Sequence, residues 1–253
     1  IWYLYIFGYY FTLIHKLFLN NTLFMAQKFT ILFDLDGTLI DTAPDLMNAH
    51  NHVMNKYGYE TKTTEDIRQL VGKGAASLIG RSVWGQAKKE FSKVIDQDIK
   101  KEMVKEFIEY YGKNIAVESK PVNGVLEFLN WAKKNNISMG VCTNKQEYLS
   151  VNLLKQLKIY DYFEYVAGSD TFDYCKPDPR HLTNVIEIMH GDIKKSLMIG
   201  DSETDAESSK AAGIPFILLE DGYTEKKVSE IYHDYLVKDF VNIEQIISKY
   251  LDH

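Results

Sequence analysis

The sequence predicts an α/β fold in which a parallel sheet forms the core and a helical segment is inserted after the first strand. Residues 29–33 form a short apolar run without strict alternation, which is typical of a strand buried on both faces of a parallel sheet. Between residues 41 and 116 no strand pattern occurs, so this stretch is expected to be helical. After Pro121, strand patterns alternate with helical patterns, which predicts βαβ units with right-handed crossovers.

The predicted elements follow in chain order. After the strand at 29–33, helices are expected at 44–57, 64–71, 75–84 and 87–111. Later strands are expected near Ile137, Tyr165, Leu197, Phe216 and Tyr235. Leucines at helical spacing mark the helix after the strand near 137, at Leu149, Leu153, Leu154 and Leu157. Linkers near 41–42 and 117–118 would act as hinges between the inserted helices and the sheet.

Two aspartates, Asp34 and Asp36, follow the first strand in the segment FDLDGTLIDT. Residues i and i+2 of a strand point to the same side, so both carboxylates are expected to face one cleft at the carboxyl edge of the sheet. Gly37 lets the chain turn sharply after them. Like charges this close are costly unless a cation lies between them or one carboxyl is protonated. The pair therefore indicates a metal site, an acid/base pair, or both.

A calcium-binding loop is the alternative interpretation of Asp-x-Asp-Gly. The EF-hand pattern requires Gly at its sixth position and Glu at its twelfth, which counted from Asp34 are Leu39 and Asp45. The pattern therefore excludes this type of calcium site.

Two further motifs come directly after predicted strands. Thr143 and Asn144 follow the strand near 137 and precede a helix, where a hydroxyl group and new backbone N–H groups form an anion site. Lys176 is a compact positive charge, and Asp178 and Pro179 suit the start of the next helix. Each pattern alone is also typical of an ordinary helix cap or surface turn.

A fourth motif, GDSETD, follows the strand near Leu197 and places Asp201 at its end, with Asp205 four residues later on the next helix. Gly-Asp after a strand is often only a turn. Four such motifs at strand ends in one chain are poorly explained by coincidence, so together they predict a catalytic site.

In this order, FDLDGTLIDT, CTNK, CKPDP and GDSETD resemble the four motifs of the haloacid dehalogenase superfamily of aspartate-nucleophile phosphatases. The resemblance spans about residues 28 to 237. The segments DTAPDL, VGKGA, TNK and GDSETDAESSKAAG are most similar to the phosphoglycolate phosphatase family. This resemblance implies a Rossmann-like α/β core at 25–42 and 117–253, an α-helical cap at 43–116, and Mg²⁺-dependent hydrolysis of 2-phosphoglycolate to glycolate and phosphate.

The resemblance also implies a catalytic role for each motif residue. Asp34 would be the nucleophile and would form an aspartyl-phosphate. Asp36 would protonate the leaving alkoxide and later deprotonate the attacking water. Thr143 and the Asn144 backbone N–H would bind phosphoryl oxygens, and Lys176 would neutralise charge beside the nucleophile.

Magnesium is the cofactor that the resemblance implies. Its expected protein ligands are the Asp34 carboxylate, the Asp36 backbone carbonyl and Asp201, with water completing an octahedron. Asp205 would hold a metal-bound water or orient the ligands.

Substrate choice is expected to come from the cap, where VGKGA at 71–75 is the most suggestive segment. Gly72 permits close backbone approach, and Lys73 could meet a carboxylate. The alternative is a turn between helices with an exposed lysine. A helical cap over a small cleft favours a small phosphorylated metabolite over a protein or polymer substrate.

Other functions remain as alternatives. A phosphatase for another small phosphomonoester and a pyrophosphatase share these motifs. The sugar-phosphate mutases of the superfamily carry a different fourth motif, with an acidic pair instead of Gly-Asp-x-x-x-Asp, so Asp201 and Asp205 disfavour them. Asp36 disfavours dehalogenation, which needs no acid/base at that position. A non-catalytic binding protein would usually have lost the nucleophile, and Asp34 is present.

Composition limits the partners and the compartment. With 45% hydrophobic residues the chain can build a packed core. The net charge is −6 and the lysines form no basic stripe, which disfavours nucleic-acid binding. The only two cysteines, Cys142 and Cys175, lie inside strand-end motifs, so a reducing cytoplasm is expected. A monomer or a homodimer would fit.

Residues 1–24 are not expected to belong to this fold. Their uninterrupted apolar part ends at His15, which is short of the ~20 residues that a spanning helix needs. We therefore do not expect this segment to cross a membrane. No basic leader or small-residue cleavage site marks a signal peptide. Because Met25 directly precedes the first strand, we expect it to be the true start, with 1–24 as translated upstream sequence. The alternative is a tail that docks to a membrane or a partner.

Overall fold

The computed structural model describes residues 28–84, 97–224 and 226–251. The expectations for residues 1–24 and for the first part of the helix at 87–111 therefore lie outside the described residues.

The core is a six-stranded sheet in the order β5-β4-β1-β6-β7-β8. All its neighbouring strands are parallel, as the sequence predicts. The strands are β1 (Thr30–Phe33), β4 (Ser138–Cys142), β5 (Tyr165–Ala167), β6 (Ser196–Gly200), β7 (Phe216–Leu219) and β8 (Tyr235–Val237). The first strand lies in the middle, between β4 and β6, so the loops after β1, β4 and β6 meet at one edge of the sheet.

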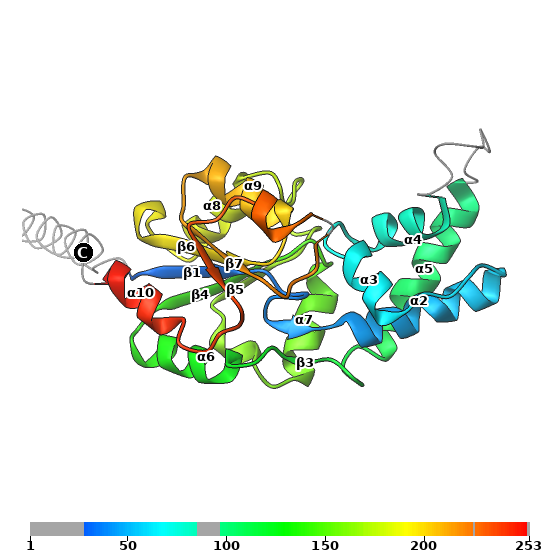
Figure 1. Ribbon diagram of the computed structural model, residues 1–253, viewed down its shortest axis with the longest axis horizontal. Coiled ribbons are helices and arrows are strands. Elements are labelled where there is room, and N and C mark those ends of the chain that lie inside the picture. Colours follow the sequence, from blue (N-terminus) through cyan, green and yellow to red (C-terminus); the bar gives the residue numbers. More distant parts are fainter. Residues whose placement is uncertain (1–27, 85–96, 225, 252–253) are drawn as a thin grey trace, which may run out of the picture.

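Helices cover both faces of the sheet (Figure 1). One face carries α6 (Val125–Lys134), α7 (Glu147–Gln156) and α10 (Glu244–Leu251), and the other carries α8 (Arg180–Ile188) and α9 (Glu203–Ala212). Strand β1 serves both layers, because Ile31 and Phe33 pack into one apolar cluster and Leu32 into the other. Burial on both faces explains why this strand shows no polar alternation.

The helix after the third motif begins slightly later than expected. It starts at Arg180, with Pro179 immediately before it instead of in its first turn. The Asp178 carboxylate still accepts a hydrogen bond from the Arg180 backbone N–H at 2.9 Å. A backbone N–H group at the N-terminus of the helix therefore has a side-chain partner, although the N-cap position itself is occupied by Pro179 and not by Asp178.

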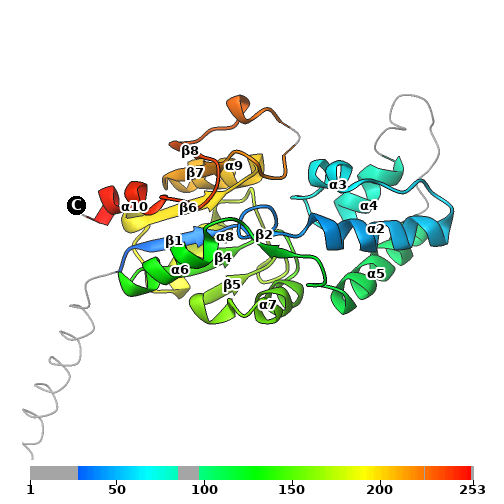
Figure 2. The ribbon, with the colours of Figure 1, turned by 60° about the horizontal axis from the view of Figure 1, so that its bottom comes forward.

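Four helices stand together beside the sheet, next to the carboxyl ends of its strands (Figures 1 and 2). They are α2 (Ala43–Tyr57), α3 (Thr64–Leu70), α4 (Ala75–Trp84) and α5 (Gln97–Lys113). The starts and ends of the first three agree with the sequence-based ranges to within one residue. Helix α3 begins with a capping box, in which Thr63 and Asp66 exchange side-chain and backbone hydrogen bonds.

The chain segments just before and just after this helical part pair with each other as a short antiparallel ladder, β2 (Ile40–Asp41) with β3 (Lys120–Pro121). The sequence did not predict this ladder, because two-residue strands have no recognisable period. Single 3₁₀ turns lie at η2 (Tyr160–Tyr162), η3 (Ile193–Lys195) and η4 (Val228–Glu230). Within the described residues, no helix has the length and apolar character needed to cross a bilayer.

Candidate active site

A cavity of about 700 Å³ lies between the strand ends of the core and the inserted helices. The core side contributes the residues of the first three motifs, namely Asp34, Asp36, Thr143, Asn144 and Lys176. The helical side contributes a turn and two helices, with Gly72, Lys73, Leu78, Phe107 and Tyr111. The cavity therefore has a polar, charged floor on the sheet and a largely apolar wall on α4 and α5.

Asp34 and Asp36 both line the cavity, directly after strand β1. The strand ends at Phe33, but the backbone N–H of Asp34 still donates to the carbonyl oxygen of Ile199 in β6 at 3.0 Å, and the turn begins only at Gly37. Gly37 has a φ of 86°, a left-handed conformation that glycine adopts readily. A Cβ atom at Gly37 would also overlap the Asp201 carboxylate. The close approach of Asp201, as well as the turn, therefore requires glycine at this position.

Asp34 shares a buried lysine with Asp205. Lys176 Nζ donates to Asp34 Oδ1 and to Asp205 Oδ1, each at 2.6 Å. The other oxygen of Asp205 accepts hydrogen bonds from the backbone N–H groups of Asp201 and Ser202 and from the Ser202 hydroxyl. Asp205 thus fixes both the start of α9 and the position of Lys176.

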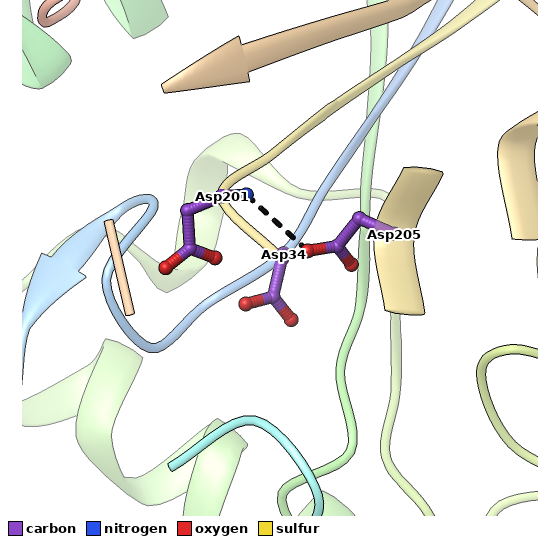
Figure 3. Close-up of side chains that lie close together, drawn as sticks. All are labelled: Asp34, Asp201 and Asp205. Atoms are coloured by element: carbon purple, nitrogen blue, oxygen red, sulfur yellow. Dashed lines mark hydrogen bonds between the residues drawn. The ribbon is translucent and has the colours of Figure 1, made fainter. Parts of the chain in front are cut away.

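Asp34, Asp201 and Asp205 form a buried acidic cluster, with one ligand oxygen from each within 4.8 Å of the others (Figure 3). Burial raises the pKa of Asp34 to about 7, although the nearby Lys176 acts in the opposite direction. Burial, followed by the charge of Asp34, raises the pKa of Asp201 well above its usual range. Oxygen donors that repel one another in a dry site are suited to a divalent cation, which would offset their charge.

Two neighbouring groups orient Asp201 within this cluster. Its Oδ1 accepts from the Thr38 hydroxyl at 3.0 Å, and its Oδ2 accepts from the backbone N–H of Tyr223. Asp201 and Asp205 are both almost completely buried, whereas Asp34 lines the cavity. Asp205 accepts four hydrogen bonds through its side chain and Asp201 accepts two, so Asp201 has more lone pairs left than Asp205.

Thr143 and Asn144 follow β4 directly, but they precede α7 by several residues, since that helix begins at Glu147. The expected backbone N–H groups of a helix start are thus not at these two positions. Asn144 instead bridges the two sides of the cavity. Its Nδ2 donates to the carbonyl oxygen of Gly72 at 3.1 Å and to that of Lys176 at 3.0 Å.

The turn between α3 and α4, which contains Gly72 and Lys73, also lines the cavity. Gly72 and Gly74 both have positive φ, at 99° and 79°, so the glycines are needed for the backbone of this turn. Lys73 Nζ lies 3.2 Å from Glu203 Oε1, at the beginning of α9. The turn therefore contacts the core through an ion pair as well as through Asn144.

Sequence reasoning missed a second lysine at the floor. Lys145 Nζ donates to both carboxylate oxygens of Asp36, at 2.7 and 2.8 Å, and lies 4.6 Å from the centre of the Tyr111 ring. Thr42 also donates to Asp36 Oδ1, at 2.7 Å. Lys145 belongs to the TNK triplet that carried the family resemblance, but the triplet alone gave no reason to assign the lysine a role.

Tyr223 was also missed. Its hydroxyl donates to Asp41 Oδ1 at 2.6 Å and accepts from the Ala43 backbone N–H at 2.9 Å, while its own backbone N–H donates to Asp201. The residue thus connects the acidic cluster with the first linker. Its position in a loop after β7 offered no sequence signal beyond the preceding Gly222, whose Cβ would overlap Asp201.

Comparison with known proteins identifies the family. Residues 31–219 match the family model described as haloacid dehalogenase-like hydrolase. Proteins named phosphoglycolate phosphatase from Mesorhizobium japonicum and Agrobacterium fabrum are 39% identical over 210 residues and 37% identical over 223 residues. These matches cover 83% and 86% of this chain, and 90% and 94% of the two relatives.

A solved structure supports the same assignment. A predicted phosphoglycolate phosphatase from Haemophilus somnus matches 88% of this chain and 99% of its own, at 28% identity and a TM-score of 0.78. The match to the family model includes all four strand-end motifs. The chain therefore belongs to the haloacid dehalogenase-like hydrolase family.

Proposed function

We propose that this phosphatase hydrolyses 2-phosphoglycolate to glycolate and phosphate through an aspartyl-phosphate. The observation that carries this proposal is the pair Asp34 and Asp36 on the floor of one cavity, each held by its own buried lysine. The names of the relatives indicate the substrate. Two carboxylates that are fixed separately can take two different roles in one reaction.

Asp34 is the proposed nucleophile. It lines the cavity and is held through Oδ1 by Lys176, which leaves Oδ2 to attack phosphorus. In this proposal Lys176 and the Thr143 hydroxyl face the phosphoryl oxygens, together with the backbone N–H of Asn144. The side chain of Asn144 fixes this loop to Gly72 and to the third motif. Positioning these groups before reaction lowers the barrier, because they need not reorganise when charge develops.

Asp36 is the proposed general acid and base. In the first step it would protonate the leaving alkoxide, and in the second it would deprotonate the water that attacks the aspartyl-phosphate. Thr42 and Lys145 hold its carboxylate at the cavity wall, beside Asp34. The same residue can serve both steps, because the leaving group and the attacking water occupy the same side of phosphorus in turn.

The family generally uses a divalent metal ion, and we propose Mg²⁺ for this chain. Its ligands would be the Asp34 carboxylate, the Asp36 backbone carbonyl and Asp201, with Asp205 orienting them through Lys176 and the backbone of α9. The ion would supply positive charge to neutralise the phosphoryl group. The raised pKa values of Asp34 and Asp201 support a cation here.

The helices α2 to α5 are the proposed cap, at about 43–116, and the linkers at 41–42 and 117–118 its hinges. Gly72 and Lys73 would contribute to substrate binding from the cap side. Lys73 brings a positive charge to the cavity wall, where it would attract a substrate that carries several negative charges. Closure of the cap would exclude water from the floor during phosphoryl transfer.

A larger phosphomonoester is the second candidate substrate. The cavity volume of about 700 Å³ exceeds what a two-carbon acid phosphate fills, and Val104, Phe107 and Ile108 give its helical wall apolar surface. The chemistry at Asp34 and Asp36 would be the same.

The deciding experiment measures phosphate release by the chain starting at Met25, with Mg²⁺, over a panel of small phosphorylated metabolites and pyrophosphate. We expect the highest kcat/KM for 2-phosphoglycolate and complete loss of activity with a chelator. Preference for another member of the panel would contradict the proposed substrate, and activity that survives chelation would contradict the proposed role of the metal.

For the location of the protein we propose the cytoplasm, since both cysteines are unpaired.

A further inference from the structure

Lys145 is placed for more than an ion pair with Asp36. Its side chain is only 6% exposed, yet the residue lines the cavity. An ammonium group has three hydrogens, and in the described part of the chain Nζ donates only to the two oxygens of Asp36. A buried lysine with a hydrogen left over beside a cavity can bind an anionic group of a ligand.

The opposite wall at this point also has an unused donor. Tyr111 of α5 lies over Lys145 Nζ and lines the cavity. Its buried hydroxyl has no hydrogen-bond partner among the residues that the structure describes. An unsatisfied buried hydroxyl is costly, so this wall also carries a polar group without a partner beside Lys145.

The position of Asp36 determines which part of the substrate lies near Lys145. A general acid must be within hydrogen-bond distance of the ester oxygen, about 2.7 Å. Lys145 Nζ is 2.7 Å from Asp36 Oδ1. The ester oxygen and Nζ are thus separated by at most two hydrogen-bond lengths. An acid group attached one carbon from the ester oxygen could therefore reach Nζ.

The other lysines of the cavity wall are less suitable for this group. Lys176 is held by Asp34 and Asp205, on the phosphoryl side of the floor. Lys73 pairs with Glu203 and Lys226 with Glu207, and both side chains are more than two-fifths exposed. Charge in contact with water is worth far less for recognition than charge on a dry floor.

We propose that Lys145 Nζ binds the carboxylate of the leaving group, so that the site selects phosphomonoesters of 2-hydroxy acids. The inference rests on the proposed function and names the residue behind its substrate class. Lys145 would donate its remaining hydrogen to the substrate while it stays bonded to Asp36, so binding of the acid group and orientation of the general acid are linked. A phosphomonoester without the carboxylate would leave the ammonium paired with Asp36 alone.

The test compares 2-phosphoglycolate with ethyl phosphate, which has the same two-carbon chain but no acid group. For the wild type we expect kcat/KM to be at least 100-fold higher on 2-phosphoglycolate. In Lys145→Met and Lys145→Gln this preference is expected to fall to less than 5-fold, mainly through KM for 2-phosphoglycolate. Lys226→Met, a matched change at an exposed lysine of the same wall, is expected to keep the full preference. Thermal unfolding reports whether each variant is folded.

The ratio between the two substrates separates recognition from a structural role, because a distorted floor or a displaced Asp36 would slow both reactions alike. If the wild type prefers 2-phosphoglycolate and the folded Lys145 variants keep that preference, the inference is wrong and the proposed function stands. If the wild type hydrolyses both substrates equally well, the proposed substrate is wrong and the inference falls with it.

Discussion

At the scale of single residues, the two carboxylates of the first motif differ because two different lysines hold them. Lys176 contacts Asp34, and Lys145 contacts Asp36. A reaction in which one carboxylate attacks phosphorus and the other transfers a proton needs such a division. Each lysine also provides part of the positive charge that keeps a buried carboxylate in a fixed orientation.

The first prediction concerns the nucleophile. Asp34→Asn is expected to lower phosphate release at least about 1000-fold, because an amide cannot form the covalent intermediate. The fold should survive, since the amide oxygen can still accept the hydrogen bond of Lys176. Asp178→Asn, the same change at a carboxylate that pairs with Arg180, serves as the control and should retain activity. Activity of Asp34→Asn near that of the wild type would remove the assignment.

The buried His181 is expected to make the stability of the fold depend on pH in the acid range. It is completely buried in α8, and burial lowers its pKa to about 4, with Lys176 acting in the same direction. An unfolded histidine has a pKa near 6.5, so between about pH 6.5 and 4 the unfolded chain binds more protons than the native one. This group therefore stabilises the fold above pH 6.5, and its contribution is lost as the pH falls towards 4.

The difference between His181→Leu and the wild type isolates this effect, since other titrating groups largely cancel. Between pH 7 and pH 5 we expect the wild type to lose about 2 kcal/mol relative to the variant. Urea unfolding at the two pH values measures it. A difference in unfolding free energy that does not change with pH would show that the native histidine titrates normally.

At the scale of elements, the inserted helices are fixed to the core by polar contacts at their linkers. Asp45, in the first turn of α2, accepts hydrogen bonds from the backbone N–H groups of Glu118 and Ser119 and from the Ser119 hydroxyl. Its side chain therefore joins the outgoing helix to the returning linker. The carboxylate is buried, so its loss leaves several donors without a partner.

Asp45→Ala is expected to lower the unfolding free energy by about 3 kcal/mol, because the donors of the linker would be buried and unsatisfied. Denaturant unfolding measures the change. Asp161→Ala, at an exposed aspartate of η2, should change stability by less than about 0.5 kcal/mol. Equal effects in the two variants would mean that the linker finds other partners.

Tyr223 contacts the first linker through its hydroxyl and the acidic cluster through its backbone N–H, so a substitution can test the first contact alone. Tyr223→Phe removes the hydroxyl that bonds Asp41 and Ala43, but it keeps the backbone N–H that bonds Asp201. We expect a loss of about 1–2 kcal/mol in stability and a lower kcat, with an unchanged metal concentration for half-maximal activity. Tyr232→Phe, at an exposed tyrosine, is the control. A changed metal requirement would contradict this separation.

The elements that sequence could predict are those with a local signal. Helix α4 was predicted at its observed bounds, because its apolar residues recur at helical spacing. The floor contacts were not predictable in this way: Lys145 lies 109 positions after Asp36, and Tyr223 lies 182 after Asp41. Asp34 and Asp36 do reach one cavity, and there the local signal sufficed, because both follow β1 directly. Local patterns predict helices, strands and short motifs, whereas contacts between residues far apart in the sequence depend on the fold.

At the scale of the whole molecule, the site exists only where two parts meet. The sheet supplies the charged floor, while α4 and α5 supply the apolar wall. The acidic cluster includes Asp34 on this floor and the buried Asp201 and Asp205, so its charge affects the stability of the core as well as the chemistry. The proposed binding of a metal ion would therefore depend on pH and would contribute to folding stability.

The sign of that link follows from Asp34. Its pKa is about 7 in the native protein against 3.8 in the unfolded chain, so the native state binds more protons in between. Without metal, the stabilisation from this bound proton is complete below about pH 4 and is lost as the pH rises through 7. A divalent cation would take the place of the proton. Its stabilising effect should therefore be larger above pH 7, where no proton needs to be displaced.

Thermal unfolding with and without Mg²⁺ at pH 8 and pH 5 tests this. At pH 8, with Mg²⁺ at about 100 times its dissociation constant, we expect a gain of about 2.7 kcal/mol, or a Tm higher by roughly 5–10 °C. At the same Mg²⁺ concentration, the gain at pH 5 should be much smaller, because protons compete with the cation for Asp34. Asp201→Asn, which removes one proposed ligand, should abolish the gain at pH 8. A gain that is the same at both pH values, or that survives in Asp201→Asn, would place the cation elsewhere than at the acidic cluster.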